Sequence, residues 1–209
     1  TAASATCSAS LPIDQTDAIV RELVTRLASH PTIAGWLTTD QLIRNVTAVV
    51  DNIANGLTPS GHLGKVRPAG SFQVREDRGS LWIDTRSFRR YDRYADAVAA
   101  LDARGAARLY ATLRPRLIDG YRELGHPDGN FDQAFERALI ELLKTPVIDG
   151  DIALASKSVA YEFADPRLQS LSSAQRQLLR MGPRNVRLIQ AKLREIAPFV
   201  GIAPESLPR

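Results

Sequence analysis

Cysteine is almost absent from this sequence: Cys7 is the single cysteine among 209 residues, so no disulfide can form within the chain. Long apolar runs are absent as well, since no stretch reaches the roughly 18 residues that a membrane-spanning helix needs. Residues 4–6 (Ser-Ala-Thr) form a poor lipid-attachment signal before Cys7, which we therefore interpret as an exposed thiol. Cysteine chemistry thus indicates neither a compartment nor a cross-linked fold.

The common catalytic and cofactor signatures are lacking too. The sequence contains no G-x-S-x-G, no P-loop and no dinucleotide-type glycine run, and its three histidines stand beside Gly or Pro without helical ligand spacing. Residues 128–132 (DGNFD) copy the opening of a calcium loop, but Gln133 replaces the required glycine and Leu139 replaces the bidentate glutamate. We therefore predict no metal and no cofactor, and we expect Asn130 or Asp132 to cap a helix there.

Positive charge is in small excess. Lys and Arg number 27 against 23 Asp and Glu, which gives a net charge of +4, and almost all of the basic residues are arginines. This electrostatic footprint is well short of the dense basic face of a dedicated nucleic-acid binder. Nucleic acid is therefore not a favoured partner, whereas the 44% hydrophobic content is typical of a globular protein.

Helical periodicity is the main feature that is present. Apolar residues recur at intervals of three and four, with Thr39 or Asp40 as the predicted cap of the second helix and Pro183 opening the last. A loop rich in Gly and Pro follows the second helix at residues 57–70. The predicted helices cover about residues 14–28, 40–54, several segments between 91 and 144, 174–180 and 183–196.

Two segments alternate apolar and polar residues as strands do. Residues 72–83 predict a β-hairpin that turns at 76–79, and residues 152–163 predict two further strands with a turn at Ser156-Lys157. Because an isolated hairpin is marginally stable, we expect the later strands to extend it. The predicted fold class is mainly α (α+β), a multi-helix globular domain with a small antiparallel β-sheet.

One domain accounts for most of the chain. We expect residues 13–200 to form a single globular helical domain, with a flexible tail at residues 1–12 and a C-terminal tail at residues 201–209, because neither repeats nor a linker divide the body. The chain starts at Thr1 rather than at a methionine, which suggests that an upstream segment has been removed.

Four segments, in this order, resemble the bacterial family named domain of unknown function 3014, and the likeness extends from about residue 13 to 197. The resemblance implies no established activity, substrate or catalytic residues. It does imply a location on the periplasmic side of the inner membrane, with a membrane anchor in an N-terminal segment that is absent here. The segments are DNIANG (51–56), YRELGHPDGNFD (121–132), YEFADP (161–166) and LLRMGPRN (178–185).

Arginines and aromatic residues alternate in residues 86–94 (RSFRRYDRY), a combination that can pair with anions and stack on rings. The favoured interpretation is that the aromatic residues face the core, while the arginines are solvated or paired with Asp92 and Asp96. Residues 178–193 allow a phosphate-binding helical hairpin or, as we favour, a sharp corner between packed helices. The candidate binding residues are His62, Lys65, Arg67, Arg86, Arg89, Arg90, Arg93, Arg184 and Arg187.

Three functional hypotheses follow. The favoured one is a non-enzymatic binding or scaffold module of the bacterial envelope, which recognises another envelope protein or an anionic polymer through loop 57–70 and the arginine-aromatic stretch. The second is anion or nucleic-acid binding through an Arg/aromatic surface. The third is an uncharacterised hydrolase that uses His62 or His126 with a carboxylate such as Asp128 or Asp132. The sequence makes no prediction of the oligomeric state.

Overall fold

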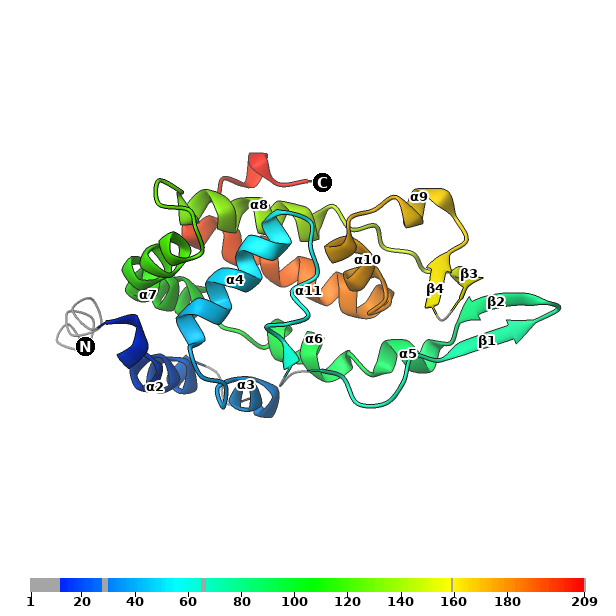
Figure 1. Cartoon of the computed structure of the whole chain (residues 1–209), viewed down its shortest axis with the longest axis horizontal. Helices are drawn as coiled ribbons and strands as arrows, with labels where there is room; N and C mark the ends of the chain where they lie inside the picture. The colour runs from blue at the N-terminus through cyan, green and yellow to red at the C-terminus, as the bar shows by residue number, and fades with distance from the viewer. Residues whose placement is uncertain (1–11, 28–29, 65–66, 159, 209) are drawn as a thin grey trace.

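Helices make up most of the computed structural model, and a small sheet lies at one end of the molecule (Figure 1). The structure describes every residue except 1–11, 28–29, 65–66, 159 and 209, so Cys7 and Lys65 lie outside the described residues. The predicted class, mainly helical α+β, is confirmed; the four strands exclude an all-α description. No helix in the described ranges combines the length and the apolar character needed to cross a membrane.

The helices follow the predicted periodicity, with ends that differ by a few residues. The helices are α2 (Asp17–Leu27), α3 (Pro31–Trp36), α4 (Leu42–Ala54), α5 (Thr85–Arg89), α6 (Asp92–Ala99), α7 (Ala103–Glu123), α8 (Phe131–Leu143), α9 (Pro166–Gln169), α10 (Ser173–Leu179) and α11 (Pro183–Ile196). Short 3₁₀ turns are η1 (Ile13–Gln15), η3 (Ala197–Val200) and η4 (Pro204–Ser206). The strands are β1 (Val74–Asp77), β2 (Ser80–Ile83), β3 (Ala153–Lys157) and β4 (Ala160–Phe163).

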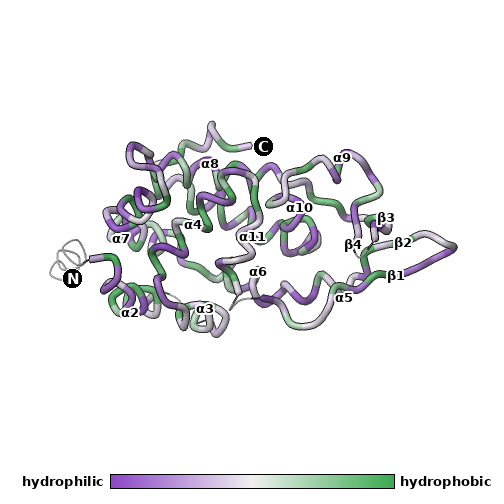
Figure 2. The backbone as a smooth tube through the Cα atoms, viewed as in Figure 1, coloured by the Kyte–Doolittle hydropathy of each residue, from purple (hydrophilic) through white to green (hydrophobic). Residues whose placement is uncertain are grey.

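Helix α4 is central to the larger apolar core. Its Leu42 and Ile43 are fully buried, and they share one cluster with Leu117 of α7 and Phe131 of α8. The apolar positions of α4 recur at helical spacing, so one face of the helix can pack on α7 and α8 together. Green and purple segments alternate along the helices in Figure 2, as expected for helices with one buried face.

The cap of α4 comes from another helix. The carboxylate of Asp17 accepts hydrogen bonds from the backbone N–H groups of Gln41 and Leu42, at 2.7 and 2.8 Å, while Gln41 adopts a left-handed conformation with φ of 56°. The prediction that Thr39 or Asp40 caps this helix is therefore wrong. A cap supplied across 24 residues of sequence leaves no local signature of the kind that capping rules recognise.

The sheet joins two hairpins that are far apart in the sequence. Its strand order is β1-β2-β3-β4, all antiparallel, and β2 pairs with β3 through Leu81 opposite Leu154. This confirms that the later strands extend the first hairpin. The turn predicted at Ser156-Lys157 is wrong, because both residues belong to β3 and the chain turns after Lys157, where Ser158 has a φ of 51°.

The corner between α10 and α11 is packed rather than open. Gly182 has a φ of 85° and is buried, and a Cβ atom there would lie 2.4 Å from Cγ of Phe88. Pro183 follows at the first position of α11. The predicted corner between packed helices is thus confirmed, and because the Phe88 ring covers Gly182, its backbone is not presented to a phosphate.

A buried amide holds the same corner to the α5–α6 segment. Asn185 is 1% exposed, and its Nδ2 donates to the backbone oxygens of Phe88 (3.1 Å) and Met181 (2.9 Å) and to Oδ1 of Asp92 (2.9 Å). We refer to Gly182, Asn185 and their contacts with Phe88 and Asp92 as the α11 clamp. It fixes the arginine-aromatic stretch against the C-terminal helices.

Residues 201–208, which the sequence suggests to be a C-terminal tail, lie against the helices. Ile202 is 6% exposed and shares a cluster with Leu139 of α8 and Ala197, against which Leu207 also packs. Ser206 Oγ lies 3.3 Å from Oε1 of Glu136.

Replacing the buried amide of the α11 clamp should destabilise the protein. Asn185→Ala leaves the carbonyl oxygen of Met181 without its donor and removes the amide hydrogen bonds to Phe88 and Asp92. We expect a loss of about 1 to 3 kcal/mol in the free energy of unfolding. Urea denaturation followed by circular dichroism measures it. Gln133→Ala, on the exposed side of α8, is the control and should change stability by less than about 0.5 kcal/mol. Equal effects of the two substitutions would contradict the role of Asn185.

A matched pair of glycines separates backbone strain from crowding. Gly79 and Gly182 have similar φ values of 78° and 85°, but a Cβ atom at Gly79 meets nothing within 4 Å. Gly79→Ala should therefore cost only the left-handed strain of about 1 to 2 kcal/mol. Gly182→Ala should cost about 1 to 3 kcal/mol more, because Phe88 must move. Similar urea midpoints for the two variants would show that the Phe88 contact is loose.

Candidate functional site

Loop 57–70 and the arginine-aromatic stretch, predicted to form one recognition surface, are in contact. The hydroxyl of Tyr94 donates to the backbone oxygen of Arg67 at 2.9 Å, and Nε of Arg90 donates to the backbone oxygen of Ala69 at 3.3 Å. The two segments are therefore continuous on the surface, although more than 20 residues separate the bonded positions in the sequence.

An open pocket of about 320 Å³ lies where these segments meet. Helices α3, α4 and α6 and the loop residue Leu63 form its walls, and no charged side chain lines it. We call it the apolar groove. Residues that line it include Ile33, Trp36, Val49, Leu63, Tyr94 and Val98.

Arg67 and Arg93 contact Tyr94, which lines the apolar groove. The guanidinium of Arg93 lies 4.7 Å from the centre of the Tyr94 ring, and its Nη2 donates to the Tyr94 hydroxyl. Arg67, Arg89 and Arg93 are exposed, and among the described residues none of them has a carboxylate partner. This part of the surface therefore carries positive charge that the described part of the chain does not neutralise.

Three other predicted arginines are neutralised. Arg86 binds Asp84 at 2.6 Å and holds the pKa of that carboxyl at about 2 through its hydrogen bonds. Arg187 pairs with Asp149, and Arg184 pairs with Asp96 at 2.7 Å.

The sequence predicts that arginines of the arginine-aromatic stretch are either solvated or paired with Asp92 and Asp96. Both aspartates face α11 instead, where Arg184 lies 3.8 Å from Asp92 and 2.7 Å from Asp96. The reason is geometric: α6 packs along α11, so its acidic residues meet a basic residue of the neighbouring helix rather than one of their own segment.

Arg90 lines a second pocket, of about 290 Å³, together with Tyr91, Tyr161, Gln177 and Arg180. We call it the arginine pocket. The sequence indicates Arg90 but not Arg180 as a binding residue, because Arg180 precedes the Gly-Pro corner and belongs to no binding motif. Its side chain comes from the α10–α11 corner and meets strand β4, where Nη2 donates to the backbone oxygen of Tyr161 at 3.2 Å.

Among the described residues, neither His62 nor His126 pairs with Asp128 or Asp132, the carboxylates suggested for a hydrolase. Nδ1 of His62 lies 3.1 Å from Oδ1 of Asn45, an amide rather than a carboxylate. Asp132 accepts hydrogen bonds from Arg114 and Tyr110, and that from Arg114 lowers the pKa of Asp132 below its usual value. Such a carboxylate is a weak base held in an ion pair.

His126 pairs with a carboxylate that the sequence analysis did not select. Its Nε2 lies 3.2 Å from Oδ1 of Asp51 on α4, and its ring stacks on Tyr121 with the ring centres 4.3 Å apart. Both contacts attach the α7–α8 turn to the helices beside it. Asn130 caps α8, as predicted, by accepting from the N–H of Asp132 at 3.0 Å. No group of three or more potential metal ligands was found in the part of the chain that the structure describes.

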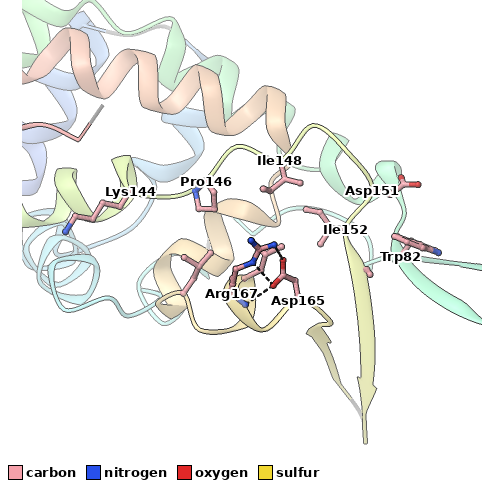
Figure 3. A pocket seen from close by; sticks show the side chains of 11 residues that line it. Trp82, Lys144, Pro146, Ile148, Asp151, Ile152, Asp165 and Arg167 are labelled. Carbon is pink, nitrogen blue, oxygen red and sulfur yellow. Dashed lines mark hydrogen bonds and ion pairs between the residues drawn. The ribbon is translucent and has the colours of Figure 1, made fainter.

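A pocket of about 690 Å³ lies between the sheet and α9 (Figure 3). Its two carboxylates are paired: Asp165 and Arg167 point toward each other and pair at 3.0 Å, and Asp151 pairs with Arg75 at 2.8 Å. Three distant segments form this pocket, around Trp82, residues 144–153 and residues 165–171, so no single motif in the sequence could indicate it.

The four segments that carry the family resemblance meet in pairs. Residues 51–56 contact residues 121–132 through Asp51 and His126, and residues 161–166 contact residues 178–185 through the hydrogen bond from Arg180 to Tyr161. The four segments are therefore parts of the structural framework around the α10–α11 corner and the α7–α8 turn.

Comparison with known proteins gives one match. No curated protein and no solved structure matches the chain. Residues 42–197, which include all four segments and the walls of the arginine pocket, match the family model described as Protein of unknown function (DUF3014), and the chain belongs to this family.

Proposed function

We propose that the protein is a non-enzymatic binding module, and that its apolar groove holds an apolar segment of a partner protein flanked by acidic residues. The observation that carries the proposal is the position of the groove: it is lined by uncharged side chains and lies where loop 57–70 meets α6. Loops held on a helical scaffold are frequent recognition surfaces.

The hydrophobic effect favours an occupant with apolar side chains. Trp36, Val49 and Val98 are partly exposed at the groove, and covering apolar surface contributes about 25 cal/mol for each Å² removed from water. A groove of this kind suits an apolar anchor of an amphipathic helix, because such helices present residues at intervals of three and four. A few buried apolar anchors can supply most of the binding energy.

The charges around the groove favour acidic flanks on the partner. Arg67 and Arg93 are close to Tyr94, and neither has a carboxylate partner in the described part of the chain. Complementary charges at the rim of an interface raise the association rate and exclude wrong partners. We include an envelope location in the proposal, on the periplasmic side of the inner membrane, because the family resemblance implies it.

Site-specific photo-crosslinking in the native cell tests this proposal. A photoreactive residue at position 63, in the groove, should form a discrete adduct with one partner, whereas the same residue at position 137 on the exposed face of α8 should form none. Sequencing of the crosslinked peptide should show apolar residues flanked by Asp or Glu. The double charge reversal Arg67→Glu and Arg93→Glu should reduce the adduct by about tenfold or more.

Three results would contradict the proposal: no adduct from position 63, equal adducts from positions 63 and 137, or an adduct that persists undiminished after charge reversal. A heterogeneous adduct with an anionic polysaccharide would show that the partner is an envelope polymer and not a protein. Thermal unfolding of each variant shows whether a lost adduct reflects a lost fold.

A further inference from the structure

Arg180 is a partly buried cation without an acidic partner. Its guanidinium lies 5.2 Å from the centre of the Phe163 ring and donates to the backbone oxygen of Tyr161, but no carboxylate pairs with it among the described residues. Burial and the neighbouring Arg176 both lower the pKa of Arg180, so its surroundings disfavour its positive charge. Burying a charge without a counter-charge is costly, and folded proteins normally supply one.

The acidic residues near this pocket are already occupied. Glu162, adjacent to Tyr161 on β4, pairs with Lys157 at 2.7 Å, and Asp92, adjacent to Tyr91, accepts from Asn185 at 2.9 Å. The described part of the chain therefore supplies no anion to Arg180.

Arg180 and Arg90 both line the arginine pocket, and Nε of Arg90 also donates to the backbone oxygen of Ala69 at 3.3 Å. The guanidinium of Arg90 lies 5.6 Å from the centre of the Tyr91 ring. Gln177 Nε2 donates to the Tyr91 hydroxyl at 3.0 Å, so that hydroxyl keeps its own hydrogen for another acceptor. Two guanidinium groups and a hydroxyl donor thus line one pocket of about 290 Å³.

We propose that the arginine pocket binds a phosphate group, either as inorganic phosphate or as the phosphomonoester of a small organic molecule. The planar fork of an arginine donates two parallel hydrogen bonds to phosphate oxygens, and the ligand supplies the negative charge that Arg180 lacks. Phe72 and Tyr161, whose ring centres are 6.2 Å apart, also line the pocket. Their rings offer an apolar surface to an organic group attached to the phosphate. The site is separate from the apolar groove and does not depend on the function proposed for it.

Calorimetric titration of the full chain tests the site. The probes are inorganic phosphate and glycerol 3-phosphate, with sodium acetate and sodium chloride at matched ionic strength as controls. We expect the two phosphates to bind at one site and the controls not to bind. Tighter binding of glycerol 3-phosphate would identify a phosphomonoester as the preferred source, and tighter binding of inorganic phosphate would identify the free ion.

Arg180→Met and Arg90→Gln should each weaken phosphate binding by about tenfold or more, because each removes a charged hydrogen-bond donor. Arg187→Gln, which changes an exposed arginine paired with Asp149, should leave the affinity unchanged. Phosphate should also raise the melting temperature of the wild type and not that of Arg180→Met.

Stability without ligand separates a binding role from a structural one. If Arg180 serves to bind a ligand, Arg180→Met should be about as stable as the wild type in phosphate-free buffer, because removing a partly buried unpaired charge offsets the loss of its hydrogen bond to Tyr161. The proposal is overturned if millimolar phosphate gives no heat, if Arg180→Met binds as tightly as the wild type, or if that variant is strongly destabilised while Arg90→Gln binds normally.

Discussion

The arrangement of the apolar groove and the arginine pocket depends on the α11 clamp. The buried amide of Asn185 bonds to the backbone of Phe88 and to Asp92, and Gly182 allows the Phe88 ring to lie directly on the α10–α11 corner. A buried amide can satisfy these groups only at hydrogen-bonding distance, and any side chain larger than hydrogen at Gly182 would push the ring away. The clamp therefore fixes how the α5–α6 segment lies on the C-terminal helices.

Charge pairing explains which arginines remain available to a ligand. Arginine dominates the basic residues, and many of its side chains meet carboxylates of neighbouring elements, as Arg44 does with Asp14 and Glu123. The guanidinium groups that lack such a partner among the described residues include Arg67, Arg90 and Arg180, which come from segments that meet around α5 and α6. Exposed ion pairs contribute little stability, so the distribution of unpaired charge matters more for binding than for folding.

The sequence predicted the helices and the antiparallel sheet because both rest on local periodicity, as in the apolar face of α4 and in the spacing of Leu81 and Ile83 in β2. It failed where a distant residue supplies the decisive contact. Asp17 caps α4 from a different helix, and Arg184 forms ion pairs with the carboxylates of α6. Arg180 donates to the backbone oxygen of Tyr161, which is distant in the sequence. None of these partners is adjacent in sequence, so neither capping rules nor charge patterns could identify them.

The arginine-aromatic stretch is one segment in the sequence but serves two surfaces in the structure. Tyr94 and Val98, four residues apart, face the apolar groove, as helical spacing requires. Arg90 and Tyr91, at the junction of α5 and α6, face the arginine pocket instead. Because the stretch divides between α6 and the junction that precedes it, its alternation of charge and aromatic rings combines two separate patterns. One is an apolar helix face with exposed arginines beside it, and the other is a cationic pocket lined by aromatic rings.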